Sequence, residues 1–162
     1  METTARNLHQ KRDRTASKAQ QLDLRSHLTS RRGDRQLSEL KKILVVDDEP
    51  DMLEIARICL EQVGNFVVHA AKSVQAALDI LSDFQPDLIL LDVVMPSING
   101  LDGIPMFRRT FGGPIVMMSA RVQPEEIAMY MDRGATAVIA KPFDVSALAP
   151  RISQILKSTE QA

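Results

Sequence analysis

The sequence has little cysteine and no long apolar run. Among its 162 residues Cys59 is the only cysteine, so the chain cannot form an internal disulfide. Its apolar neighbours predict a buried thiol that packs as a small hydrophobic side chain. No apolar stretch approaches the roughly 20 residues that a helix needs to cross a bilayer, and the N-terminus lacks the apolar block of a secretory signal. These absences predict a cytoplasmic protein with no membrane span.

Histidine is also scarce, and its positions do not suggest a metal site. His9, His27 and His69 show none of the spacings with which histidines bind a metal ion. A metal site in this chain would therefore depend on carboxylates.

Charge is spread unevenly along the chain. Residues 1–40 carry nine Lys or Arg against five Asp or Glu, and the remaining residues carry eleven against sixteen. The first 40 residues contain no aromatic side chain that could stack on bases, so we expect a basic, flexible N-terminal tail rather than a nucleic-acid-binding segment. The spacing of Leu24 and Leu28 leaves open a short helix that becomes ordered on a partner.

From residue 41 onward, short apolar runs alternate with helical patterns. This alternation is typical of βαβ units around a parallel sheet and predicts one α/β domain over 41–158, with 159–162 as the C-terminal end. The helix near 100–109 contains Gly103 and Pro105, so we expect an irregular start there, and Pro150 predicts a kink in the last helix. The predicted strands are 43–46, 66–70, 88–91, 115–118 and 137–140.

Polar residues end four of these apolar runs. The carboxyl ends of parallel strands meet at one edge of a sheet, where open α/β sheets bind ligands, so we expect these side chains to meet. Carboxylates suit Mg²⁺, and a hydroxyl and an ammonium suit a phosphoryl group. The four landmarks are the pair Asp47 and Asp48, then Asp92, Ser119, and Lys141 followed by Pro142.

Each landmark also has a structural interpretation when it is taken alone. The acidic pair could cap the next helix, Asp92 could be a turn residue, Ser119 a strand-end hydroxyl and Lys141 a surface charge. The functional interpretation is favoured because all of them fall at the carboxyl end of a different strand.

With VVDDEP at 45–50, LDVVMP at 91–96, SA at 119–120 and KPF at 141–143, the chain resembles the receiver domain of bacterial response regulators. The resemblance covers about residues 41–158. It implies a five-stranded parallel sheet of order 2-1-3-4-5 flanked by helices, the flavodoxin-like receiver fold.

The resemblance also implies a role for each landmark. Asp92 would accept a phosphoryl group from a phosphohistidine on a histidine kinase or a histidine phosphotransfer protein. Ser119 and Lys141 would contact the phosphoryl oxygens, and the peptide before Pro142 would be cis. The implied Mg²⁺ ligands are Asp48 directly, Asp47 through water, Asp92, and the main-chain carbonyl of Val94.

Three positions depart from the family pattern. Receivers usually place an aromatic residue where this chain has Val138, so the usual aromatic switch cannot operate. Pro150 falls on the surface that most receivers use to bind partners. Val94 is apolar where many relatives have a polar side chain that could orient water, which predicts a long-lived aspartyl phosphate.

Together these features predict a stand-alone response regulator that signals by protein contact with an unknown downstream partner. It would not be an enzyme, although it would catalyse its own phosphorylation and dephosphorylation. Because the sequence stops at Ala162, no DNA-binding domain is expected. The alternative is a receiver-like scaffold that works without phosphorylation. A phosphohydrolase is disfavoured because such enzymes usually separate the two aspartates by one residue, whereas Asp47 and Asp48 are adjacent.

Overall fold

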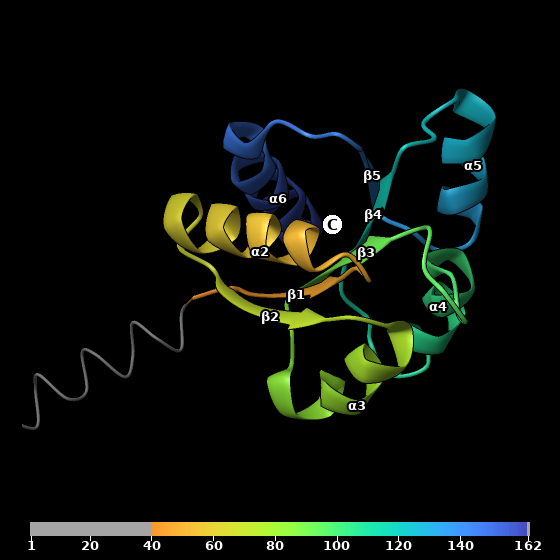
Figure 1. Cartoon of the computed structure of the whole chain (residues 1–162), viewed down its shortest axis with the longest axis horizontal. Helices are drawn as coiled ribbons and strands as arrows, with labels where there is room; N and C mark the ends of the chain where they lie inside the picture. The colour runs from red at the N-terminus through yellow and green to blue at the C-terminus, as the bar shows by residue number, and fades with distance from the viewer. Residues whose placement is uncertain (1–39, 162) are drawn as a thin grey trace, which may run out of the picture. The chain divides into compact units, whose positions relative to one another are not determined.

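The structure, a computed structural model, describes residues 40 to 161. Five parallel strands form one sheet in the order β2-β1-β3-β4-β5 (Figure 1). The predicted α/β fold and strand order are confirmed. The strands are β1 (Lys42–Val46), β2 (Val67–Ala71), β3 (Leu88–Asp92), β4 (Ile115–Ser119) and β5 (Ala137–Ala140).

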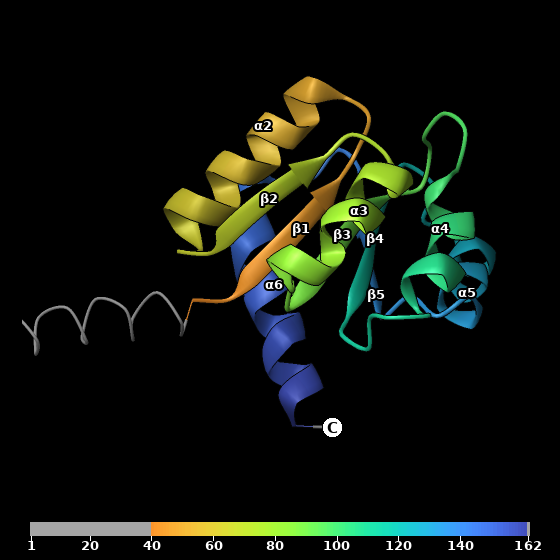
Figure 2. The same ribbon diagram turned by 90° about the horizontal axis from the view of Figure 1, so that it is seen from below.

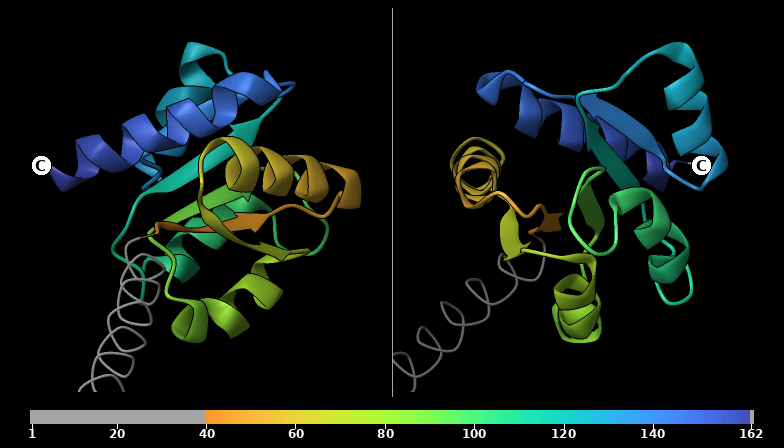
Figure 3. Two further views of the ribbon diagram at one scale, coloured as in Figure 1. Left: turned by 90° about the vertical axis from the view of Figure 1, so that its left-hand side faces the viewer. Right: turned by 45° about the vertical axis from the view of Figure 1, so that its right-hand side comes forward.

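Helices cover both faces of the sheet (Figure 2). One face is covered by α2 (Pro50–Ile58), the π-helical turn η1 (Cys59–Val63) and α6 (Val145–Glu160). The other face is covered by α3 (Val74–Phe84), α4 (Gly100–Phe107) and α5 (Pro124–Asp132). Figure 3 shows the two helical layers on either side of the strands.

The three central strands are almost fully buried because alternate side chains enter two separate cores. In β1, Ile43 and Val45 pack under α2 and α6, whereas Leu44 and Val46 pack under α3 and α4. This period of two is the geometry of an extended strand, and burial on both faces explains why the central strands read as continuous apolar runs.

Capping side chains fix where the helices begin. The hydroxyl of Ser73 accepts the backbone N–H of Ala76 at 3.1 Å at the start of α3, and serine is a preferred residue at this capping position. The expectation of an irregular start near residue 100 is wrong. The side chain of Asn99 accepts the N–H of Asp102 at 2.8 Å, so α4 has an ordinary cap despite the Pro105 inside it.

Helix α2 and the π-helical turn after it bury only part of the face that their apolar pattern predicts. The apolar spacing predicts a buried stripe of Met52, Ile55, Ala56, Cys59, Leu60 and Val63. Ala56, Cys59 and Leu60 are buried, but Ile55 is 41% exposed and Val63 is 59% exposed. Leu53 is buried instead. Apolar residues occupy more than one side of this helix, and the π-helical turn at its end shifts the phase, so periodicity alone did not fix the buried side.

Several other predictions can be set against these helices. Cys59 is buried, as expected. Helix α6 runs without interruption past Pro150 to Glu160, beyond residue 158, and the kink stays a prediction. Among residues 40 to 161, no helix combines the length and the apolar character that crossing a bilayer demands. The predicted tail, with its helix at Leu24 and Leu28, lies outside the described residues.

Candidate functional site

The carboxyl ends of the strands bring the polar landmarks together. Asp47 directly follows β1, Asp92 ends β3 and Ser119 ends β4, and these three are the buried polar or charged residues of the described chain. Lys141 follows β5 and extends back toward β1 and β3. The parallel sheet therefore brings residues that lie far apart in the sequence together in one cluster.

Three carboxylates form the acidic part of the cluster. One oxygen from each of Asp47, Asp48 and Asp92 lies within 4.8 Å of the others. Asp47 has no exposed surface, and its Oδ1 accepts the backbone N–H of Glu49 at 2.9 Å, which fixes the carboxylate. Asp48 is half-buried and opens the cluster toward solvent. Grouped carboxylate oxygens with solvent access fit Mg²⁺, which retains several water ligands.

Lys141 forms ion pairs with the two buried carboxylates at the same time. Its Nζ lies 2.7 Å from an oxygen of Asp47 and 2.7 Å from an oxygen of Asp92. Burial raises the pKa of the Asp92 carboxyl, and the nearby Asp47 adds to this, while Lys141 opposes it. For Lys141, burial acts to lower the pKa, but the hydrogen bonds to Asp47 and Asp92 leave it raised. The ammonium therefore stays protonated between two acids.

The remaining predicted residues are placed as follows. The Lys141–Pro142 peptide is cis. The side chain of Val94 is 76% exposed beside the cluster, and the role of its carbonyl as a metal ligand stays a prediction. Val138 packs against the same apolar cluster as Tyr130.

Sequence reasoning missed Tyr130, which contacts Ser119 directly. The Tyr130 hydroxyl lies 3.1 Å from Ser119 Oγ in the buried interior, and it donates to the main-chain carbonyl of Arg121 at 3.4 Å. Ser119 Oγ also accepts the N–H of Arg121 at 3.0 Å. The only signal was that the single tyrosine of the chain falls on the apolar side of its helix, which reads as core packing.

Gly100 was missed as well. A Cβ at this position would lie 2.0 Å from the main-chain oxygen of Asp92. The Gly100 N–H donates to the carbonyl of Val93 at 2.9 Å, so α4 begins in direct contact with the segment that carries Asp92. Only glycine permits this approach.

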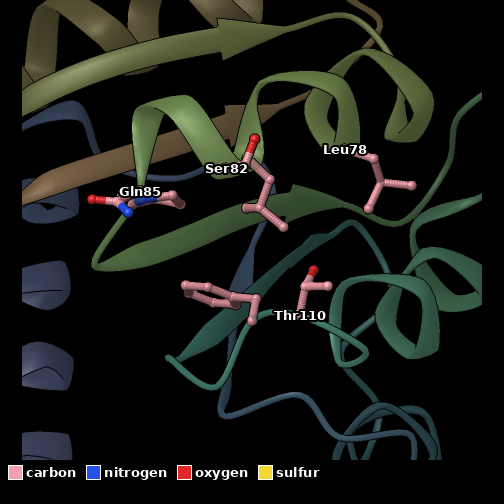
Figure 4. Close-up of a pocket in the computed structure, with 7 residues that line it drawn as sticks. Leu78, Ser82, Gln85 and Thr110 are labelled. Atoms are coloured by element: carbon pink, nitrogen blue, oxygen red, sulfur yellow. The ribbon is translucent and has the colours of Figure 1, made fainter.

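A second hollow lies away from the acidic cluster (Figure 4). It is lined by Leu78 and Ser82 of α3, by Gln85, and by Thr110 and Phe111, which precede β4. These segments lie at the amino ends of the strands, and no charged side chain lines the hollow. It therefore plays no part in the site at the carboxyl ends.

Comparison with known proteins identifies the family. The family model of the response regulator receiver domain matches residues 43–153. This chain belongs to that family, whose members are the signalling domains of two-component systems. The chain is 37% identical over 118 residues to the transcriptional regulatory protein CpxR of Escherichia coli, covering 73% of this chain and 50% of CpxR. It is 33% identical over 120 residues to the DNA-binding response regulator MtrA of Mycolicibacterium smegmatis, covering 74% of this chain and 52% of MtrA.

Solved structures show the same fold. The chemotaxis response regulator CheY4 of Vibrio cholerae matches with a TM-score of 0.67 at 26% identity, covering 72% of this chain and 98% of that chain. A CheY-like receiver domain protein from Methanospirillum hungatei matches with a TM-score of 0.68 at 26% identity, covering 76% of this chain and 98% of that chain.

These relatives correct one prediction. The chain spans about half the length of the curated relatives it matches, and these include regulators named as DNA-binding. The expectation that no DNA-binding domain accompanies this receiver is therefore wrong. It was drawn from where the sequence stops, and that position carries no information on further domains. The stand-alone arrangement predicted with it gains no support from these relatives.

Proposed function

We propose that residues 40–161 act as a phosphorylation switch in which Asp92 accepts a phosphoryl group from a phosphohistidine donor in a Mg²⁺-dependent reaction. In this step the P–N bond to histidine breaks and a P–O bond to an Asp92 carboxylate oxygen forms. The observation that carries the proposal is the buried cluster of Asp47, Asp92 and Lys141, with both ion pairs at 2.7 Å. A purely structural role for so much buried charge is disfavoured, since apolar residues of similar volume are often as stable.

The residues of the cluster divide the work of phosphoryl transfer. The transferred group needs an in-line nucleophile and compensation of the charge on its oxygens. Asp92 supplies the nucleophile, and Lys141 supplies a fixed positive charge within reach of it. Ser119, at the end of the neighbouring strand, supplies a hydroxyl that donates to a phosphoryl oxygen. These groups let the domain catalyse its own phosphorylation and dephosphorylation.

The metal would be held by the carboxylates of Asp47, Asp48 and Asp92 together with the carbonyl of Val94. When bound, Mg²⁺ supplies positive charge that offsets the repulsion between these carboxylates and an incoming phosphoryl group. The exposed apolar side chain of Val94 offers no group to orient an attacking water, so we expect the aspartyl phosphate to be long-lived. A half-life of seconds at neutral pH with Mg²⁺ would contradict that expectation.

A cytoplasmic location is part of the proposal on the strength of the family resemblance.

The test measures intact mass after incubation with acetyl phosphate and Mg²⁺. The wild-type chain should gain the mass of one phosphoryl group, and the gain should disappear in Asp92→Asn and in the presence of a chelator. Asp132→Asn, which changes an exposed carboxylate at the end of α5, is the matched control and should be phosphorylated like the wild type. No gain in the wild type would favour the scaffold alternative, and a gain in Asp92→Asn would move the acceptor elsewhere.

A further inference from the structure

Tyr130 and Ser119 form a buried hydroxyl pair whose protons can be arranged in two ways. Each hydroxyl carries one proton. Ser119 Oγ already accepts the Arg121 N–H at 3.0 Å, and the two hydroxyl oxygens lie 3.1 Å apart. When Tyr130 donates to the Arg121 carbonyl, the Ser119 proton is left to bond the Tyr130 oxygen. In this arrangement Ser119 has no proton to offer to a phosphoryl group on Asp92.

The second arrangement reverses the direction of the bond. If Ser119 donates to a phosphoryl oxygen, its proton leaves Tyr130. Tyr130 then either turns its own proton toward Ser119, giving up the Arg121 carbonyl, or keeps that bond and loses the hydrogen bond that it accepted from Ser119. Both outcomes change the hydrogen bonds of a side chain that is only 2% exposed. A buried polar group left without a partner is costly, so the two arrangements are distinct states.

We propose that Tyr130 is the positioning residue for Ser119 and reports phosphorylation of Asp92 to helix α5. The proposal rests on the proposed function and extends it, because it identifies how this chain compensates for Val138. The aromatic ring comes from a helix instead of β5, and it is already hydrogen-bonded to the hydroxyl that must respond.

A surface groove next to Tyr130 would be affected by a change in the hydrogen bonds of its hydroxyl. Tyr130 lines a groove between α5 and the segment after β3, which also includes Val94, Arg121, Glu126 and Met129. The groove has a volume of about 370 Å³, and Tyr130 lies in its wall with almost all of its surface buried. In this proposal a change in the hydrogen bonds of Tyr130 alters the wall of the groove.

The composition of the chain makes the proposal directly measurable. The sequence contains one tyrosine and no tryptophan, so the intrinsic fluorescence above the phenylalanine contribution comes from Tyr130 alone. We expect acetyl phosphate with Mg²⁺ to change this fluorescence in proportion to the phosphorylated fraction measured by mass on the same samples. Mg²⁺ alone, and both reagents with Asp92→Asn, should leave it unchanged. Ser119→Thr, which keeps the hydroxyl, should retain the change, and Ser119→Ala should lose it.

A second measurement uses beryllofluoride, a phosphoryl mimic, with Mg²⁺ and fluorine NMR. Tyr130→Phe removes the competing acceptor of the Ser119 proton, so the affinity for beryllofluoride should rise by roughly 2- to 10-fold, the range expected for one hydrogen bond. The gain should vanish in the Ser119→Ala background. A ring that only packs the core would give no gain, or a loss, in either background.

The outcomes separate the two proposals. A mass gain at Asp92 with unchanged tyrosine fluorescence, or an unchanged beryllofluoride affinity in Tyr130→Phe, overturns the role of Tyr130 and leaves the phosphoacceptor intact. No mass gain in the wild type overturns the proposed function and this inference with it.

Discussion

Lys141 crosses from the end of β5 to Asp92 at the end of β3, placing its ammonium nitrogen 2.7 Å from the carboxylate oxygen Oδ1. The same nitrogen contacts Asp47 at 2.7 Å, so one cation compensates two buried acids. A metal ion or a phosphoryl group that enters the cluster must share these carboxylates with Lys141. In the proposed switch, these ion pairs correspond to the resting state.

Removing this ammonium should destabilise the fold. Lys141→Met keeps the aliphatic stem but leaves Asp47 and Asp92 as uncompensated buried carboxylates, so we expect the free energy of unfolding without Mg²⁺ to fall by about 3 kcal/mol. Mg²⁺ should restore more stability to the variant than it adds to the wild type. Urea unfolding measures both effects. Lys157→Met, at an exposed position on α6, should stay within about 0.5 kcal/mol of the wild type.

The stability of the Mg²⁺-free protein should depend on the ionisation of Asp92. Its pKa in the fold is raised above the ordinary 3.8, chiefly by burial, so the folded state holds this proton more tightly than the unfolded chain. This tighter proton binding adds to the free energy of unfolding. The contribution is complete below the pKa that Asp92 has in the unfolded chain and is lost as the pH rises through its pKa in the folded state. The asparagine side chain in Asp92→Asn cannot ionise, so this variant does not lose stability as the pH rises.

We therefore expect Asp92→Asn to be more stable than the wild type near neutral pH, by on the order of 1 kcal/mol, with the difference shrinking toward pH 4. Urea unfolding across this range measures it, with Asp79→Asn on the exposed face of α3 as the control. Mg²⁺ should narrow the neutral-pH difference. A wild type that is the more stable protein at neutral pH without Mg²⁺ would contradict the direction of the pKa shift.

The start of α4 lies so close to the main chain of Asp92 that position 100 should tolerate no side chain. In Gly100→Ala the new Cβ would overlap the Asp92 carbonyl, so either α4 or Asp92 must move. We expect a loss of roughly 1–3 kcal/mol in the free energy of unfolding and a lower phosphorylation rate. Gly112→Ala, where a Cβ would meet no atom within 4 Å, should change stability by less than about 1 kcal/mol and leave phosphorylation intact. Equal behaviour of the two variants would argue against a tight contact.

Much of the fold could be predicted because the strands are short, mostly apolar runs and four of them end at a polar landmark. Parallel topology then brings Asp47, Asp92, Ser119 and Lys141 to one edge without any knowledge of side-chain positions. The buried face of α2 could be predicted only in part, since apolar residues such as Ile55 and Leu53 lie on more than one side of the helix.

Two residues near the acidic cluster could not be recognised from the sequence. Tyr130 looked like an ordinary core residue because its role depends on a hydrogen bond to Ser119, eleven positions earlier on another element. Gly100 looked only like a poor helix former. Its close approach to Asp92 is a contact that no local sequence pattern indicates. Both are contacts between elements, and periodicity describes only one element at a time.

The central claim, that Asp92 is the phosphoacceptor, is tested most directly by chemical trapping. Borohydride reduces an aspartyl phosphate to homoserine and leaves a free carboxylate unchanged, so the modified position can be identified by peptide mass spectrometry. After treatment with acetyl phosphate and Mg²⁺, we predict homoserine at position 92 alone. Homoserine at position 47 or 48, or a phosphoryl group found only on another residue, would contradict the account.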